Sequence, residues 1–367
     1  MIARAPNGLH IQLGMGRNSF CRLFCQLVEP SQNVVFSILL LTVYGLFVFG
    51  ATDPKHESAK PSKSHSKKHE VTQHFLTIKS IKLRYIEAGK GQAVVMIHGN
   101  AGGIEDFEFG VFDSLCPKYR VIAFDRPGHG ASGRRDSKSA TVEYQAQLLH
   151  DTLTDLGITK PILVGHSWGG SLALAYALKY PDQPSALVLL APAAYPDTET
   201  NGILRSFVKT PIIGDLGLFF GKALIGHTML KHDLEQAFYP QQVPDDYFKI
   251  AASSWLGTKQ LRAYLEDEWA LNSSLKKMSK RYSEIHVPVV VITGDDDKIV
   301  SPRENAFRLT SEISNAKLVE LKDTGHEIPL TRPDCVRDAL STLDMPGFET
   351  VARQSRVNAL AEAATNP

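Results

Sequence analysis

The sequence predicts an α/β fold built on a doubly wound, mostly parallel sheet. Five almost wholly apolar runs are typical of strands that helices cover on both faces, as in parallel sheets. They lie at residues 93–97, 121–124, 162–164, 186–190 and 289–293. Helical spacing of apolar residues occurs at 141–156 and 172–178 between these runs, and the alternation implies right-handed crossovers. In folds of this kind, ligands bind at the carboxyl ends of the strands.

The amino end of the chain is expected to lie outside this fold. After a leader at 1–33, residues 34–51 form an uncharged apolar run close to the ~20 residues that a transmembrane helix needs. Signal-peptide apolar regions are shorter and lie nearer the start, so we expect one retained N-terminal transmembrane helix, with a late cleavage near Gly50 or Ala51 as the alternative. Residues 52–71 are rich in Lys, Ser and His with little to bury, which predicts a flexible tether.

Charges around the apolar run bear on the side of the membrane that the rest of the chain would face. Arg17 and Arg22 precede the run, whereas five lysines follow it, at Lys55, Lys60, Lys63, Lys67 and Lys68. The positive-inside rule therefore favours the cytoplasmic side, although many single-anchor enzymes face the other way, so the side is left open. The formal net charge of +1 gives no indication of a nucleic-acid partner.

Polar motifs follow the ends of the expected strands. An antiparallel pair at 75–87 is predicted by alternating apolar and polar residues, and a last strand is expected at 318–321. The motifs are H-G-N-A-G-G at 98–103, D-R-P-G-H-G-A-S at 125–132, G-H-S-W-G-G at 165–170, G-D-D-D at 294–297 and T-G-H-E at 324–327. Because parallel strands end at one edge of the sheet, these turns are expected to lie near one another.

The turn around Ser167 is the most informative of these motifs. A strand, the pattern G-x-S-x-G and then a helix at 171–180 form the order of a nucleophile elbow. A serine on so sharp a turn has a strained backbone, and Gly165 and Gly169 leave room where side chains would collide. The positive end of the following helix would face the hydroxyl group. Taken alone, the pattern also fits a glycine-rich turn with an incidental serine.

Taken in order, the five motifs resemble those of the α/β-hydrolase fold family over about residues 72–343. The resemblance implies a core at 72–192 and 287–345, a helical cap inserted at 193–286, and a C-terminal tail at 346–367. The insertion is rich in aromatic residues, which implies a small apolar or amphiphilic acyl substrate. We expect the tail to form a short helix and a loose end.

A serine hydroxyl needs a base that takes its proton as it attacks. His326 is the candidate, because it is the last of the motif histidines and lies on a loop beyond the final strand. His166 adjoins Ser167 in the chain and should point away from it. The family uses the turns that carry His98 and His129 structurally, so both are interpreted as packing residues.

The family pattern also implies the remaining site residues. It places the acid that orients the base at Asp297, with Asp295 and Asp296 as adjacent alternatives. Acyl transfer further needs two donors for the developing oxyanion. The resemblance assigns these to the backbone N–H groups of Asn100 and Trp168.

The residue at position 167 selects the reaction class. Asn100 and Trp168 also resemble the side-chain pair with which haloalkane dehalogenases hold halide, but those enzymes and epoxide hydrolases carry Asp where this chain has Ser167. We therefore expect a membrane-anchored serine hydrolase of the carboxylesterase or lipase kind, without cofactor or metal. The alternatives are a hydrolase of carbon–carbon bonds in meta-cleavage products and a non-catalytic, ligand-binding member of the fold. The oligomeric state is left open.

Overall fold

A computed structural model describes residues 71–197, 218, 226–343 and 347–365. The expected leader and transmembrane helix and all but the last residue of the tether lie outside the described residues. Contacts divide the chain into two units, and every element described below belongs to the unit formed by residues 57–201 and 222–367. Within the described ranges, no helix is both long enough and apolar enough to cross a membrane.

The sheet has eight strands in the order β1-β2-β4-β3-β5-β6-β7-β8. Their bounds are β1 (Thr72–Ile78), β2 (Ile81–Ala88), β3 (Ala93–Ile97), β4 (Arg120–Phe124), β5 (Ile162–His166), β6 (Ala186–Leu190), β7 (Val289–Gly294) and β8 (Ala316–Leu321). β2 pairs antiparallel with β1 and β4, and the strands from β4 to β8 pair parallel. The expected antiparallel edge and parallel sheet are therefore confirmed. The strand bounds agree with the expected ones within two residues, except that β1 begins three residues earlier.

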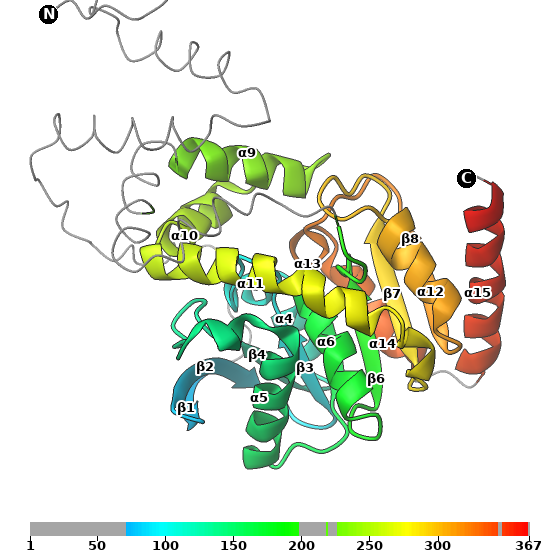
Figure 1. The fold of residues 1–367 in the computed structure, drawn as a ribbon, viewed down its shortest axis with the longest axis horizontal. Coiled ribbons are helices and arrows are strands. Elements are labelled where there is room, and N and C mark those ends of the chain that lie inside the picture. The colour runs from blue at the N-terminus through cyan, green and yellow to red at the C-terminus, as the bar shows by residue number, and fades with distance from the viewer. Residues whose placement is uncertain (1–70, 198–217, 219–225, 344–346, 366–367) are drawn as a thin grey trace, which may run out of the picture. The chain divides into compact units, whose positions relative to one another are not determined.

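Helices cover both faces of the sheet (Figure 1). On one face, α5 (Val142–Asp155) and α6 (Trp168–Lys179) pack against alternate strand residues such as Val95 and Leu163. The next residues along, Val94 and Val164, face the other side. The second face packs against α3 (Glu105–Glu108), α4 (Phe112–Leu115) and α14 (Pro333–Leu343). Every residue of β3, β5 and β6 is buried, which explains the continuous apolar runs.

The segment between β6 and β7 is helical in its described part. It contains α9 (His227–Phe238), α10 (Asp245–Trp255), α11 (Thr258–Met278) and the short turn η3 (Tyr282–Glu284). Phe238 and Tyr247, two of its many aromatic residues, belong to a small apolar cluster between α9 and α10. Residues 198–217 and 219–225 of the expected cap lie outside the described residues.

The carboxyl end of the chain differs from the expected short helix and loose end. Residues Phe348–Thr365 form one helix, α15, of 18 residues. Phe348, Ala352 and Ala359 are buried, and the Ser355 hydroxyl accepts a 2.7 Å hydrogen bond from the backbone N–H of Leu318. β8 is the last strand of the sheet, so its outer N–H groups need partners. Contacts with the sheet edge therefore stabilise the helix. The composition of the tail alone does not reveal these contacts.

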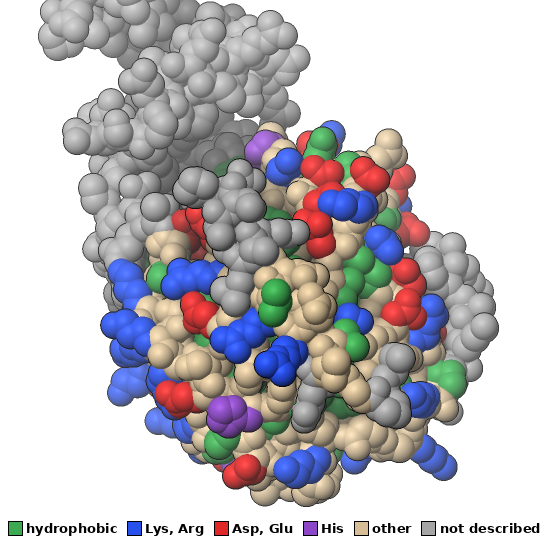
Figure 2. Space-filling model, turned by 90° about the vertical axis from the view of Figure 1, so that its right-hand side faces the viewer, with side chains coloured by type: hydrophobic (Ala, Val, Ile, Leu, Met, Phe, Trp, Pro, Cys, Tyr) green, Lys and Arg blue, Asp and Glu red, His purple; other side chains and the backbone are tan. Residues whose placement is uncertain are grey.

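The remaining elements are short and connect the strands. They are η1 (Ser137–Ala140), the π-helical turn η4 (Arg303–Phe307), α12 (Arg308–Glu312) and α13 (Ile328–Thr331). Figure 2 shows one face of the molecule, on which both signs of charge occur and apolar side chains form only small patches. That mixture agrees with the formal net charge of +1.

Candidate active site

Ser167 lies on the turn between β5 and α6 with φ of 52° and ψ of −117°. A Cβ at Gly165 would collide with the carbonyl oxygen of Gly169, and a Cβ at Gly169 would collide with that of Ile97. Glycine is thus required on both sides of the serine. The helix begins at Trp168, three residues before the expected start, because close packing on β3 outweighs the low helix propensity of glycine.

The structure brings His326 and Asp297 together. His326, on the loop after β8, places Nδ1 2.8 Å from Oδ2 of Asp297, on the loop after β7. Both side chains are buried. The other carboxylate oxygen of Asp297 accepts 2.8 Å hydrogen bonds from the backbone N–H groups of Ile299 and Val300. The carboxylate is therefore fixed by the turn that carries it, and it in turn orients the imidazole ring.

The adjacent acidic residues have other partners. Asp295 lies 3.4 Å from Nζ of Lys322, and Asp296 lies 3.6 Å from Nζ of Lys298. Both of these pairs are partly exposed, whereas the Asp297 carboxylate is buried. Geometry thus selects Asp297 from the three alternatives as the partner of His326.

The electrostatics of the pair favour an ionised acid beside a basic histidine. Burial by itself would raise the pKa of Asp297, but the His326 charge and hydrogen bond and the two backbone donors lower it below its usual value. Burial by itself would lower the pKa of His326, but the charge and hydrogen bond of Asp297 raise it above its usual value. The structure therefore stabilises a proton on His326 once it is acquired.

His166 contacts the His326 loop. Its Nε2 lies 3.0 Å from the carbonyl oxygen of His326, and the two rings are 4.8 Å apart between centroids. Burial, with the nearby His326 charge, lowers the pKa of His166 to about 3, so the ring is neutral and Nε2–H donates to the carbonyl. The residue that precedes Ser167 thus tethers the loop of His326 beside the elbow.

The turn after β3 lies directly against the elbow. A Cβ on Gly99 would be 3.2 Å from Cβ of Ser167 and 3.1 Å from Nδ1 of His166. Asn100 follows, and its side-chain amide donates to α11, at 3.2 Å to the backbone oxygen of Tyr264 and 3.1 Å to Oε2 of Glu268. The side-chain amide of Asn100 is therefore hydrogen-bonded to α11, whereas an amide that holds halide would be free to donate to it. The backbone of this turn is what borders Ser167.

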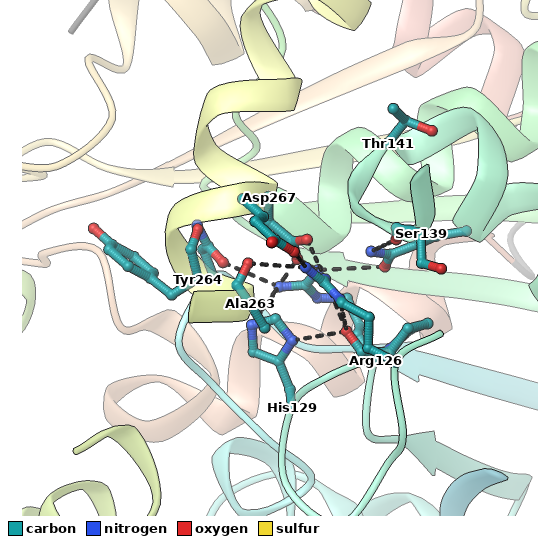
Figure 3. Close-up of polar contacts among 12 residues, drawn as sticks. Arg126, His129, Ser139, Thr141, Ala263, Tyr264 and Asp267 are labelled. Carbon is teal, nitrogen blue, oxygen red and sulfur yellow. Dashed lines mark hydrogen bonds and ion pairs between the residues drawn. The ribbon is translucent and has the colours of Figure 1, made fainter. Parts of the chain in front are cut away.

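A buried ion cluster beside this turn was not anticipated from the sequence. Asp267 of α11 points down toward Arg126 in Figure 3, and its Oδ2 lies 2.6 Å from Nη1 of Arg126. Arg134 binds the other oxygen of Asp267. The guanidinium of Arg126 lies 3.9 Å from the centre of the Trp168 ring. In the sequence, Asp267 stands within the charged run Glu266-Asp267-Glu268, which looks like a solvated helix face.

Two buried acids were also missed, Glu327, which follows His326 in the chain, and Asp106, which interacts with Glu327. Tyr247 of α10 donates a 2.8 Å hydrogen bond to Oδ1 of Asp106, and Oδ2 of Asp106 accepts from the backbone N–H of Gly103 at 3.3 Å. Burial and the charge of Glu327 raise the pKa of Asp106 well above its usual range. Burial raises the pKa of Glu327 to about 7, although the His326 charge opposes the rise.

The described residues were also compared with the side-chain groupings that hold metal ions. Within the described ranges, no group of three or more His, Cys, Asp or Glu side chains is arranged to hold a metal ion.

A model of the family described as "alpha/beta hydrolase fold" matches residues 92–333. The chain belongs to this family. The resemblance inferred from the order of the motifs is confirmed, and the family accounts for the sheet order and for the turn that carries Ser167.

Relatives of this α/β-hydrolase are found among proteins of several names. A protein from Comamonas testosteroni named 2-hydroxy-6-oxononadienedioate/2-hydroxy-6-oxononatrienedioate hydrolase is 28% identical over 269 residues, which cover 70% of this chain and 90% of that protein. An α/β-hydrolase fold protein from Burkholderia ambifaria has a TM-score of 0.64 at 21% identity and covers 74% of this chain and 98% of its own. An esterase from Exiguobacterium antarcticum has a TM-score of 0.61 at 22% identity, covering 75% and 100%. The two structural likenesses support the fold alone.

Proposed function

We propose that the protein is a membrane-anchored serine hydrolase that cleaves a carboxylic ester or a related acyl substrate through an acyl-enzyme on Ser167. The observation that carries the proposal is the 2.8 Å contact between His326 and Asp297 beside the strained turn of Ser167. Serine at this position favours acyl chemistry, because it forms an ester intermediate that water can hydrolyse.

Each residue has a defined part in the proposed reaction. Oγ of Ser167 attacks the ester carbonyl carbon while Nε2 of His326 takes the hydroxyl proton. Asp297 holds Nδ1–H and so stabilises the imidazolium that forms. The negative oxygen of the tetrahedral intermediate accepts hydrogen bonds from the backbone N–H groups of Asn100 and Trp168. When the intermediate collapses, His326 gives the proton to the leaving alkoxide, and a water molecule then repeats the sequence on the acyl-enzyme.

The helices between β6 and β7 are proposed to act as the cap. The side-chain amide of Asn100 donates to the Tyr264 carbonyl and Glu268 of α11, so α11 borders the turn beside Ser167. An aromatic-rich cover excludes water during acylation and fits a small apolar or amphiphilic acyl group. The preferred acyl length then depends on side chains of this segment.

An activity-based probe tests the central claim. A fluorophosphonate should label the wild-type protein, and both Ser167→Ala and boiling should abolish the label. Ser171→Ala serves as a matched control, because Ser171 lies one turn further along α6 and donates to the carbonyl of Ala193, and this variant should label normally. A folded wild-type protein that resists labelling would contradict the proposal and favour a ligand-binding role.

Hydrolysis of a carbon–carbon bond is the second candidate. The Comamonas relative, named for hydrolysis of 2-hydroxy-6-oxononadienedioate and the corresponding trienedioate, favours it. Ratios of kcat/KM for p-nitrophenyl esters and for a coloured ring-cleavage dienoate separate the two functions. The ester proposal requires the esters to be preferred; a strong preference for the dienoate would replace it by the second candidate.

Membrane anchoring is proposed from residues 34–51 alone. The full chain should sediment with membranes and resist carbonate extraction, whereas a chain beginning at Thr72 should remain in the soluble fraction. Replacement of two leucines in the run by arginine, at positions 39 and 40, should release the full chain from membranes. Recovery of the unchanged full chain in the soluble fraction would contradict the anchor.

A further inference from the structure

Besides its contacts with Asp267 and Gln145, Arg126 makes hydrogen bonds to the turn that borders Ser167. Its Nη2 donates to the carbonyl oxygen of Gly99 at 3.0 Å, and its Nε donates to that of His98 at 3.2 Å. Its own backbone N–H donates to Nε2 of His98 at 2.8 Å. The side chain is almost completely buried, so these contacts are made where water does not compete.

The tautomer of His98 follows from these contacts. Because Nε2 accepts a hydrogen bond, the ring proton of the neutral imidazole must be on Nδ1. Burial, together with the charge of Arg126, lowers the pKa of His98 well below its usual range, so the ring is neutral. Nδ1 lies 2.8 Å from the Gly99 oxygen and donates to it. The Gly99 carbonyl therefore accepts two hydrogen bonds, one from His98 and one from Arg126.

The orientation of that carbonyl determines the orientation of a neighbouring N–H group. The carbonyl of Gly99 and the N–H of Asn100 belong to one peptide unit, which is planar and trans, so the two groups point in opposite directions. Two donors that hold the carbonyl on one side therefore aim the Asn100 N–H to the other. Donation to the carbonyl also polarises the peptide unit and makes its N–H a stronger donor.

The charge of Arg126 is balanced from α11. Its partner Asp267 (Figure 3) is completely buried. Asp267 also pairs with Arg134. Burial lowers the pKa of Arg126 to about 10, with Asp267 opposing the decrease, so the guanidinium stays charged at neutral pH. An unpaired guanidinium at this depth would be costly. The position of α11 thus fixes the position of the guanidinium, which in turn holds the turn after β3.

We propose that Arg126 is a positioning residue that sets the peptide between Gly99 and Asn100 for oxyanion stabilisation, and that Asp267 couples this setting to α11. The inference rests on the proposed function, because the N–H of Asn100 matters only if an oxyanion forms next to Ser167. Arg126 touches no reacting atom. It acts through the peptide unit, and its loss should weaken binding of the transition state more than binding of the substrate.

Arg126→Lys tests the proposal in the full chain purified in detergent. A lysine keeps the charge but has no planar fork with which to bind two carbonyl oxygens and Asp267 together. With p-nitrophenyl butyrate, kcat should fall about tenfold or more while KM changes by less than about threefold, as expected when a transition-state interaction is lost. The inhibition constant of a trifluoromethyl ketone, which forms a tetrahedral oxyanion adduct with serine, should rise by a similar factor.

Arg134→Lys is the matched control. Arg134 shares Asp267 with Arg126 but donates to the carbonyl of Pro127 rather than to the turn beside Ser167. Arg134→Lys should leave kcat and the inhibition constant of the trifluoromethyl ketone within about threefold of the wild-type values. Asp267→Asn provides a second test if Arg126→Lys does not fold. It keeps the side-chain shape, and it should lower kcat with little change in KM because Arg126 loses its charged partner.

The outcomes separate the two proposals. An active wild type with Arg126→Lys within about threefold of it in kcat would overturn the positioning role and leave the serine hydrolase intact. Equal losses of kcat in the Arg126 and Arg134 variants, with equal decreases in Tm, would also overturn it, because only packing would be at work. A wild type without turnover or fluorophosphonate labelling would overturn both proposals together.

Discussion

The imidazole of His326 and the carboxylate of Asp297 face each other across 2.8 Å, from Nδ1 to Oδ2, at the ends of two neighbouring parallel strands. The acid is fixed by two backbone N–H groups of its own turn. The imidazole is fixed by that acid, and its backbone is held by His166. Every part of the arrangement thus depends on loops that the sheet brings to one edge.

Asp297→Asn should reduce turnover by roughly 10³–10⁴-fold, because an amide stabilises the wrong tautomer and no imidazolium. In wild type, kcat/KM should rise with pH as His326 loses its proton, with an apparent pKa above the usual 6.5. The variant's residual activity should rise at lower pH, since the charge that raises the pKa of His326 is gone. pH profiles of kcat/KM measure both effects.

Asp296→Asn is the control for this prediction. Asp296 is adjacent in the chain but pairs with Lys298 rather than His326. Its profile should overlay that of wild type. Equal losses in the two variants would show that the turn, and not the carboxylate of Asp297, matters.

Ser167→Gly should be more stable than Ser167→Ala by about 1 kcal/mol, because glycine reaches φ of 52° without the penalty of a Cβ. Urea unfolding of the two inactive variants gives the difference. The same pair of substitutions at Ser253, which is exposed within α10, should have the opposite sign, with alanine favoured by about 1 kcal/mol. If the glycine variant were the more stable one at both positions, or the alanine variant at both, the result would contradict a strained backbone at Ser167.

Glu327→Gln should raise Tm more at pH 8 than at pH 5. Burial raises the pKa of Glu327 to about 7 in the folded protein, against an ordinary value of 4.5. A group whose folded pKa is raised contributes stability that is fully present below its unfolded pKa and is lost as pH rises through the folded value. The neutral amide avoids this loss. Thermal unfolding of the wild type and the variant at pH 5 and pH 8 measures the difference in Tm.

Glu304→Gln provides the comparison for Glu327. Glu304 is exposed at the surface, so its replacement should shift Tm by the same small amount at both pH values. An increase in Tm for Glu327→Gln that is the same at both pH values would indicate a packing effect instead of a buried charge.

Gly169→Ala should destabilise the fold by about 1–3 kcal/mol, because its Cβ would collide with the backbone of β3. Gly133→Ala should cost far less, since a Cβ there would have no neighbour closer than 3.6 Å. Urea unfolding of the two variants separates them. A tolerated Gly169→Ala would mean that α6 can move away from the sheet.

The sequence was most informative where one local pattern determines the outcome. The apolar runs predicted the strands because parallel strands are buried on both faces. The glycines around Ser167 predicted the elbow because the turn is sterically restrictive. The choice of Asp297 over its two neighbours followed from the family pattern, and the contact with His326 agrees with it.

Features that depend on partners far apart in the chain were missed. Asp267 lies in a charged helical run, and only the approach of Arg126 and Arg134, more than a hundred residues earlier, turns it into a buried ion. The helix α15 was underestimated for the same reason, because its apolar face is defined by the edge of β8. Glu327 is likewise a charged residue that would be expected at the surface from the sequence, but in the structure it is buried by its surroundings.

The carboxylate of Asp267 between two arginines of the core has a consequence for exchanging segments among relatives. A chimera that carries the 193–286 region of another family member, without an acid at the equivalent place, would leave two guanidinium groups facing each other in the interior. Such a graft needs compensating changes at Arg126 and Arg134 before its substrate preference can be compared with that of the parent. Exchange of the 193–286 region between family members is therefore limited by charge as well as by shape.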